Sequence, residues 1–253
     1  MIELYHAPQS TCSQKVRICL AEKGLDWTDR RVNLAKNENL TPQYLALNPN
    51  GVVPTLVHDD KVIIDSSVIC EYLDETFPEP RLAPDDPLGR ARMRAWMRYL
   101  EEVPTSAVRV PSFNMALLPR FSGRGEDDFR ENEAAIRPIR KHFYERMGTK
   151  GFSESDFRNS LEQIAKTCAR VHDALAHGPW LLGELYSIAD IVLTPSLDRM
   201  ADLGFAHLWE KDYPRVTDWL ARIRARPAVR TAFFTGSRMS ESYQLAAPTV
   251  ATL

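Results

Sequence analysis

The chain has 253 residues, enough for two ordinary domains with a hydrophobic core. Apolar residues make up 44% and charged residues 26%, which is typical of a soluble globular protein. The 32 lysines and arginines nearly balance the 34 aspartates and glutamates, so the net charge favours neither nucleic acid nor an anionic membrane as a partner. No apolar run approaches the roughly 20 residues of a membrane span, and the first residues lack the pattern of a signal peptide. We therefore expect a cytoplasmic protein.

The cysteines and histidines give no sign of a metal site. Cys12, Cys19, Cys70 and Cys168 form no CxxC pair, and the six histidines are dispersed along the chain. Cys19 and Cys70 fall on the apolar faces of expected helices, where a small buried hydrophobe is the usual role of a free cysteine. We expect neither a bound metal nor a disulfide framework.

The first third of the chain contains short strands and helices in alternation. A strand, a helix and a second strand follow one another, and this order predicts a parallel pair of strands. Gly24 is the stop signal of the first helix. We expect strands at 2–5, 27–32, 55–57 and 62–64, helices at 13–23 and 66–77, and a short helix or turn at 40–47.

Prolines separate this α/β part from a helical remainder. Pro78, Pro80, Pro84 and Pro87 cannot continue a helix. The predicted domains are therefore 1–79 (α/β) and 88–253 (all-helical), joined by a linker at 80–87. Within the second domain we expect helices at 88–103, 157–177, 214–226 and 228–234, a capping box at 187–190, an unclear pattern at 112–155, and a loosely held tail after Ser240.

Two short motifs near the end of the first domain point to an anionic ligand. Residues 48–56 (NPNGVVPTL) place Pro54 where an apolar strand should begin, since proline has no N–H for a ladder. Asp65 and Ser66 then precede a helix, whose free N–H groups can hold an anion. Taken alone, these motifs also fit a plain strand entrance and helix cap.

The two motifs together resemble the glutathione-binding half of the thioredoxin-like domain in cytosolic glutathione S-transferases. The proline-rich linker and residues 186–191 (YSIADI) in the helical half extend the resemblance over nearly the whole chain. The resemblance implies a thioredoxin-like N-terminal domain plus an all-α C-terminal domain, glutathione as co-substrate, and a homodimer, since family members are usually dimers.

The resemblance also implies which residues hold glutathione. A cis bond joins Val53 to Pro54 in the family, and the backbone of Val53 pairs with the cysteinyl part of glutathione. Asp65 and Ser66 match the contacts to the γ-glutamyl end, and Asn39 lies near a polar contact of some relatives. Relatives often carry lysine where Gly51 stands, which leaves the partner of the glycyl carboxylate open. Lys36 is a candidate, and Arg17 is expected to be a helix-surface or interdomain residue.

The reactive loop is expected before the first helix. Residues 10–13 (STCS) resemble the SSCS of zeta-class transferases, in which a hydroxyl group stabilises the glutathione thiolate. Ser10 matches that serine and is the first candidate, with Thr11 second. Ser13 is a third candidate, because bacterial β-aryl etherases place Asn-Ser at the positions of Cys12 and Ser13. Cys12 is an alternative that would form a mixed disulfide with glutathione. A loop that only caps the helix is the non-functional alternative.

The second substrate is expected to contact the helical half. Apolar side chains there suit an aromatic electrophile, although ordinary core packing is the alternative for each of them. Residues 126–158 resemble the etherases that cleave lignin-derived ethers, as does the third helix. We predict a glutathione transferase that attacks an aromatic electrophile and cleaves a β-aryl ether. A zeta-like cis-trans isomerase and a non-catalytic binding protein are the alternatives. The candidate residues of the second-substrate pocket are Met93, Trp96, Met97, Phe113, Met115 and Phe121.

Overall fold

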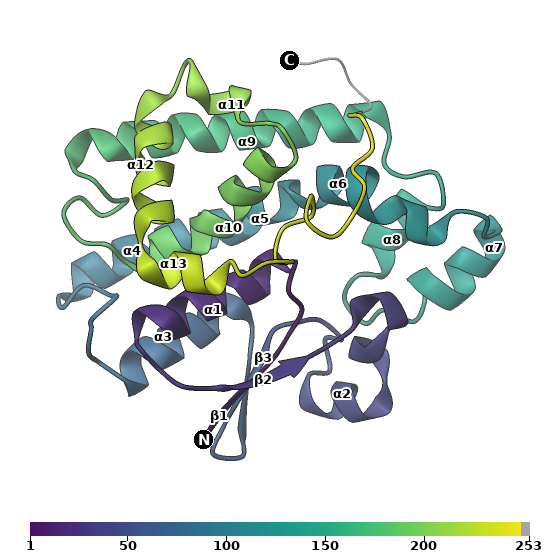
Figure 1. The fold of residues 1–253 in the computed structure, drawn as a ribbon, viewed down its shortest axis with the longest axis horizontal. Coiled ribbons are helices and arrows are strands. Elements are labelled where there is room, and N and C mark those ends of the chain that lie inside the picture. The colour runs from purple at the N-terminus through teal and green to yellow at the C-terminus, as the bar shows by residue number, and fades with distance from the viewer. Residues whose placement is uncertain (249–253) are drawn as a thin grey trace.

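The computed structural model describes residues 1–248, which form an α/β part and a helical part (Figure 1). The α/β part contains a four-stranded sheet in the order β2-β1-β3-β4. β1 pairs in parallel with β2 and antiparallel with β3, and β3 pairs antiparallel with β4. The thioredoxin-like fold expected for this half is confirmed. The strands are β1 (Ile2–His6), β2 (Thr28–Arg31), β3 (Thr55–His58) and β4 (Lys61–Ile64).

Two helices of the α/β part lie between the sheet and the helical part. Every second residue of β1 is buried, so one face of this strand packs into the core. α1 (Thr11–Glu22) packs against α3 (Ser66–Thr76), and it also contacts α10 and α13 of the helical part. α1 ends as expected before Gly24, which adopts a positive φ of 62°. α2 (Pro42–Leu47) lies apart from these helices, beside the sheet (Figure 1).

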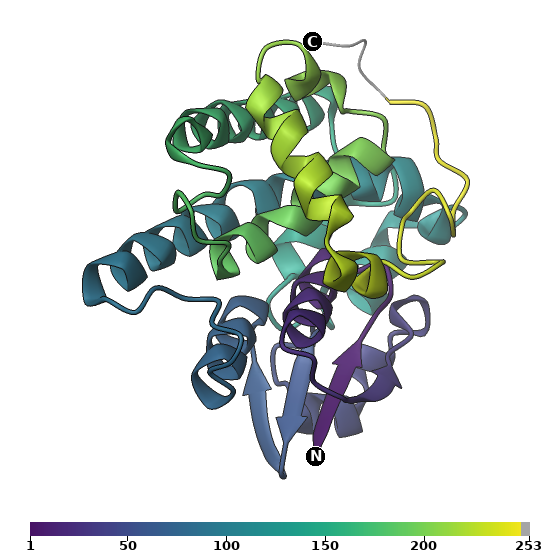
Figure 2. The same ribbon diagram turned by 60° about the vertical axis from the view of Figure 1, so that its left-hand side comes forward.

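The helical part packs on α1 and α3, on the side away from the sheet (Figure 2). Its centre is α10 (Ile188–Asp202), in which residues 188–200 are buried. Among residues 1–248, no helix is long and apolar enough to cross a membrane. The other helices are α4 (Pro87–Glu102), α5 (Pro104–Ala107), α6 (Arg109–Ser112), α7 (Glu126–Phe129), α8 (Lys141–Met147), α9 (Glu154–Ala174), α11 (His207–Glu210), α12 (Pro214–Ala225) and α13 (Pro227–Ala232).

Short helical turns connect these elements. Several of them lie within residues 112–155, which is why this segment has no clear periodicity. Prolines at 111, 119 and 138 keep the helices of this segment short. Its aromatic side chains form a small core of their own around Phe121, Phe129 and Phe152. The turns are η1 (Leu34–Lys36), η2 (Glu38–Leu40), the π-helical η3 (Phe113–Leu117), η4 (Leu118–Phe121), the π-helical η5 (Arg130–Ala134) and η6 (Leu175–His177).

The capping box predicted at the start of α10 is confirmed. The carboxylate of Asp190 accepts the backbone N–H of Ser187 at 3.0 Å and that of Leu181 at 3.1 Å. It also accepts the indole N–H of Trp219 from α12 at 2.9 Å. Asp190 is fully buried, and burial raises its pKa to about 6 although the hydrogen bonds act in the opposite direction. One carboxylate therefore joins the N-terminus of α10 to a loop and to a second helix.

The chain after Ser240 is held more closely than its sequence indicates. The backbone N–H of Tyr243 donates to Met239 at 2.8 Å, and that of Ala246 donates to Met115 at 2.8 Å. Tyr243 and Leu245 pack against the main core. The expectation of a loose tail is wrong for this stretch, because long-range contacts that no local pattern reveals hold it in place. The rest of the predicted tail, 249–253, lies outside the described residues.

Candidate functional site

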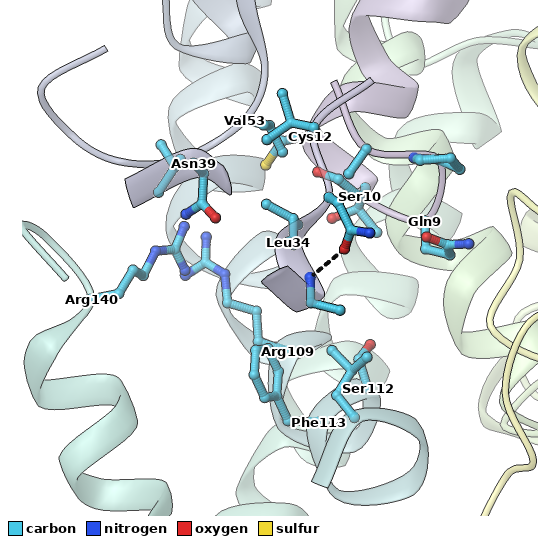
Figure 3. A pocket seen from close by; sticks show the side chains of 18 of the residues that line it. Gln9, Ser10, Cys12, Leu34, Asn39, Val53, Arg109, Ser112, Phe113 and Arg140 are labelled. Atoms are coloured by element: carbon cyan, nitrogen blue, oxygen red, sulfur yellow. Dashed lines mark hydrogen bonds between the residues drawn. The ribbon is translucent and has the colours of Figure 1, made fainter. Parts of the chain in front are cut away.

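A cavity of about 610 Å³ lies between the α/β part and the helical part (Figure 3). The loop before α1, η1, η2 and the loop before β3 form one side of it. The opposite side comes from α6, η3, α8, α10 and the residues after α13. Both parts of the chain are needed to enclose this space, which is large enough for a tripeptide or a small aromatic molecule.

Ser10 is fixed at the wall of the cavity as the N-cap of α1. Its Oγ accepts the backbone N–H of Ser13 at 3.2 Å, and its carbonyl accepts the N–H of Gln14 at 2.9 Å. Because a hydroxyl group has both a donor and acceptor positions, the oxygen can cap the helix while its O–H points to a ligand. The N-terminus of α1 adds a positive potential at the same place.

The other residues of this loop have different environments. Thr11 and Cys12 are half-buried and line the cavity beside Ser10. Ser13 is fully buried, does not line the cavity, and accepts the backbone N–H of Ala7 at 3.4 Å. The loop therefore presents Ser10, Thr11 and Cys12 to a ligand. Ser13 points away from the cavity and stabilises the loop through its hydrogen bond with Ala7.

The loop before β3 presents free backbone groups to the cavity. The bond between Val53 and Pro54 is cis, as the family resemblance implied. Among residues 1–248, no hydrogen bond engages the N–H or C=O of Val53. Asn39 holds this loop, because its amide donates to the carbonyl of Gly51 at 2.7 Å. The chain thus offers an unpaired strand-like edge beside Ser10.

Asp65 and Ser66 lie at the N-terminus of α3 and do not line the cavity itself. Oδ1 of Asp65 accepts the N–H groups of Ser67 and Val68 at 3.0 and 3.2 Å, and also the hydroxyl of Ser67. Its Oδ2 accepts no hydrogen bond from residues 1–248. Lys36, the candidate for the glycyl carboxylate, ends η1 and is also not part of the lining.

The residues expected to hold the second substrate are only partly brought together. Phe113 lines the cavity, with Phe143 and Tyr144 of α8 against its ring at centroid distances of 5.0 and 5.7 Å. The other five do not line it, which corrects those expectations. These five side chains pack against other parts of the protein. Helical periodicity marks an apolar face but does not tell whether that face lines a cavity or packs in the core. Met93, Met97 and Met115 lie in the main core, Phe121 in the small core, and Trp96 against Tyr99 and Arg170.

Comparison with known proteins identifies the family. The profile described as "Glutathione S-transferase, N-terminal domain" matches residues 4–81, and "Glutathione S-transferase, C-terminal domain" matches residues 133–222. The chain belongs to the glutathione S-transferase family. It is therefore an enzyme whose co-substrate is glutathione.

Similar proteins span nearly the full length of this transferase. Protein LigF of Sphingobium sp. strain SYK-6 is 30% identical over 92% of this chain and 93% of LigF. The crystal structure of that protein, named a beta-etherase, superposes with a TM-score of 0.82 over 92% of this chain and 98% of LigF. Maleylacetoacetate isomerase of Pseudomonas aeruginosa is 32% identical over 91% of this chain and 95% of the isomerase. A homologue from Sulfitobacter, crystallised with bound glutathione, is 26% identical with a TM-score of 0.67 over 90% of this chain and 95% of that one.

The site of this transferase also contains residues that the motifs did not indicate. Most charged residues of the lining are arginines. Arg109 reaches into the cavity from α6, and Arg140, the residue just before α8, does the same (Figure 3). Both lie in or beside the segment with no clear periodicity, so no local signal marked them. Their orientation results from how the short helices pack.

A buried network supports the loop that carries Ser10. Arg17 is 2% exposed, and its guanidinium donates to the carbonyls of Ala7 and Pro8 at 3.3 and 2.9 Å. It also donates to Ala232 of α13 at 3.0 Å. Arg17 is thus an interdomain residue, which was one of the two roles expected for it. The other expected role, a residue on the helix surface, is wrong because Arg17 is buried. The carbonyls of residues 7–8 and of Ala232 come from two distant segments, and Arg17 gives both segments a hydrogen-bond donor in the interior.

His6 completes this network in a defined tautomer. Its Nδ1 lies 3.1 Å from Nη1 of Arg17, and its Nε2 lies 2.8 Å from Oδ1 of Asp29. Because arginine can only donate, Nδ1 must accept and Nε2 must carry the proton. Protonation of Nδ1 would break the bond to Arg17 and place two cations in contact. Burial is the main reason that the pKa of His6 is lowered from its usual 6.5, followed by the charge of Arg17.

This network predicts that acid destabilises the protein below neutral pH. The pKa of His6 is lower in the folded chain than in the unfolded chain, so the unfolded chain binds a proton first as the pH falls. The contribution of His6 to the free energy of unfolding is therefore lost as the pH falls below about 6.5. Urea unfolding between about pH 5 and pH 8 measures this loss.

The matched variants are His6→Gln and His207→Gln, the latter at an exposed site. We expect the pH dependence to be weaker in the first and unchanged in the second. An equal pH dependence in wild type and His6→Gln would contradict the assignment.

Proposed function

We propose that this transferase activates glutathione as a thiolate through Ser10 and directs its sulfur to an aromatic electrophile. The observation that carries the proposal is the geometry of Ser10. Its Oγ already accepts the N–H of Ser13, so the O–H is the group available to the ligand. A hydroxyl donor and a helix N-terminus both favour the thiolate over the thiol.

Glutathione would bind along the edge formed by Val53. The free N–H and C=O of Val53 suit the cysteinyl backbone, which would pair there as an added strand. The N-terminus of α3 at Ser66 suits the γ-glutamyl carboxylate. The free Oδ2 of Asp65 suits the γ-glutamyl ammonium group. Asn39 contributes a polar side chain to the lining on the side of the cavity where Arg109 and Arg140 end (Figure 3).

We propose β-aryl ether cleavage as the reaction. The sulfur attacks the carbon that carries the ether oxygen, the C–O bond breaks with its electron pair on oxygen, and the phenolate takes a proton from solvent. The products are a thioether and a phenol. The rings of Phe113, Phe143 and Tyr144 support an aromatic substrate. The similarity to LigF, whose crystal structure is named a beta-etherase, favours the ether.

Ser10→Ala tests the thiolate donor. We expect kcat/KM for an aryl β-ether to fall about 100-fold, since loss of one donor to a reacting anion has effects of this size. The pH at which the rate reaches half its maximum should rise, because the bound thiol becomes less acidic. Steady-state kinetics over a pH series measures both.

Three further variants separate Ser10 from its neighbours. Ser10→Asp keeps the helix cap and removes the donor, so its activity should fall while its melting temperature stays near the wild-type value. Thr11→Ala and Cys12→Ala should each keep most of the activity. A complete loss in Cys12→Ala with an active Ser10→Ala would instead indicate a mixed-disulfide mechanism.

The second candidate reaction is a glutathione-dependent cis-trans isomerisation, which the similarity to maleylacetoacetate isomerase favours. Product analysis distinguishes the two reactions. Ether cleavage consumes one glutathione per turnover, whereas isomerisation returns it. Isomerised maleylacetoacetate without loss of thiol, and no cleavage of an aryl ether, would replace the proposal above.

We also propose a cytoplasmic homodimer. Val68 on α3 and Leu88 on α4 are exposed apolar side chains at 45% and 60%, which suits a contact between two copies. The four cysteines are free, as in a reducing compartment. A sedimentation mass of a single chain would overturn the homodimer.

A further inference from the structure

The cavity lining carries far more positive than negative charge. Six arginines line it, and Glu38 is the one lining carboxylate among residues 1–248. Aromatic and aliphatic side chains make up much of the remaining wall. A cavity with this composition favours an anion that also has an apolar body. The arginines are Arg31, Arg109, Arg120, Arg137, Arg140 and Arg199.

Four of these arginines are engaged by the protein itself. Arg31 donates to Asp29 at 3.0 Å, and Arg137 donates to Glu133 at 2.9 Å. Arg120 donates to the carbonyl of Leu34 at 2.8 Å. Arg199 donates to Ser112 Oγ at 3.1 Å and to the carbonyl of Gln9. These bonds fix the four side chains in the wall and account for their presence there.

Arg109 and Arg140 are different. Arg109 has one long contact, 3.5 Å from its Nη1 to the Oγ of Ser106. The guanidinium of Arg140 donates no hydrogen bond to residues 1–248, and neither arginine forms a salt bridge with them. Figure 3 shows the two guanidinium groups side by side near the amide of Asn39.

Holding these two cations together is unfavourable without an anion. Both side chains are half-buried, so water screens their repulsion only in part. Burial is the main reason that the pKa of Arg109 is lowered to about 10, and the charge of Arg140 is the next reason. A ligand carboxylate between them would receive two charge-assisted hydrogen-bond donors and remove the repulsion.

We propose that Arg109 and Arg140 bind a carboxylate of the second substrate, so that the preferred electrophile is an anionic aromatic compound. This inference rests on the proposed transferase function, because it assigns the second substrate of the same site. Phe113 lines the cavity between α6 and α8, the two elements that present the arginines. An aromatic ring on this wall can extend its carboxylate to the pair.

Charge balance favours the second substrate over glutathione as the source of that carboxylate. Bound glutathione thiolate has a net charge of about −2, and its γ-glutamyl carboxylate is assigned to the N-terminus of α3. Four lining arginines, those at 109, 120, 140 and 199, have no carboxylate within salt-bridge distance among residues 1–248. Glu38 and the glutathione charge do not fully neutralise these four, so the cavity has room for a further negative charge.

The test compares an anionic probe with a neutral one. A chlorodinitrobenzoate and its methyl ester undergo the same reaction, in which the thiolate adds to the chlorine-bearing carbon and chloride leaves. We expect Arg109→Gln and Arg140→Gln each to lower kcat/KM for the benzoate about 10-fold, the usual effect of losing a bond to a charged group. The rate with the ester should change less than about twofold. Arg140→Lys should restore part of the loss, and Arg98→Gln, on the exposed face of α4, should change neither rate.

A second arm tests glutathione as the source of the carboxylate. Glutathione monoethyl ester lacks the charge of the glycyl carboxylate. If the variants raise KM for glutathione but not for its ester, and treat both electrophiles alike, the pair binds the glycyl carboxylate and the inference is overturned. Equal losses with the benzoate and its ester would also overturn it.

A binding arm separates this inference from the proposed function. If wild type turns over neither these two electrophiles nor an aryl β-ether, the proposed chemistry fails, and calorimetric binding of the chlorodinitrobenzoate then decides the inference alone. Binding to wild type that is weakened about 10-fold in both variants supports the carboxylate site. Absent binding, or equal binding to wild type and variants, refutes it.

Discussion

Replacing Asp190 with alanine is expected to lower the free energy of unfolding by about 3 kcal/mol or more. The substitution removes the N-cap interactions of α10, which alone contribute about 1 kcal/mol. It also leaves the buried N–H groups of Leu181 and Trp219 without an acceptor, at a cost of about 1–3 kcal/mol each. Because α10 is the centre of the helical part and contacts α1, the loss should extend to the glutathione-binding half.

Urea unfolding followed by tryptophan fluorescence measures this effect. Asp190→Asn keeps one acceptor oxygen and should fall between wild type and alanine. Asp212→Ala is the control, because Asp212 is exposed and its substitution should change the free energy by less than about 0.5 kcal/mol. A loss below about 1 kcal/mol in Asp190→Ala would contradict the central role of this carboxylate.

Replacing Arg17 with methionine is expected to reduce both stability and glutathione binding. The variant keeps apolar volume but leaves the carbonyls of Pro8 and Ala232 and the Nδ1 of His6 without a donor. The carbonyl of Ala7 keeps the N–H of Ser10 at 3.2 Å. A buried acceptor without a partner costs about 1–3 kcal/mol, so we expect a total loss of about 3 kcal/mol or more. The carbonyls of residues 7 and 8 precede Ser10, so KM for glutathione should rise about 10-fold or more as the loop loses its support.

The kinetic readout separates positioning from simple stability. The activity should be measured well below the melting temperature of the variant, where the chain is folded. Arg17→Lys retains one donor and should restore part of the KM, whereas Arg92→Met, at an exposed site of α4, should leave both properties unchanged. An unaltered KM in folded Arg17→Met would show that the network supports only the fold.

Much of the α/β half could be predicted because its signals are local. The stop at Gly24 depends on a few adjacent residues, and so does the capping box at Asp190 in the helical part. Ser10 at the start of α1 is of the same kind. Local stereochemistry determines such features, so a short stretch of sequence is enough to predict them. The cis bond before Pro54 followed from the resemblance to the family.

The second-substrate wall could not be predicted in the same way. Helical periodicity marks an apolar face, but it does not tell whether that face meets the core, as at Met97 and Met115, or the cavity, as at Phe113. Charged residues pose the same problem. Arg17 is buried and Arg109 reaches into the cavity because of segments far away in the sequence, and their residue type alone indicates only a solvated surface.

The segment after α13 couples the far end of the chain to the loop that carries Ser10. Met239 and Tyr243 line the cavity, and Gln9 beside Ser10 donates to the carbonyl of Gly236 at 2.7 Å. The matched profile of the C-terminal domain ends at residue 222, so these wall residues lie outside the stretch that the profile covers. A substitution between 234 and 246 would therefore act on the wall of the substrate cavity and on the loop that carries Ser10 at the same time.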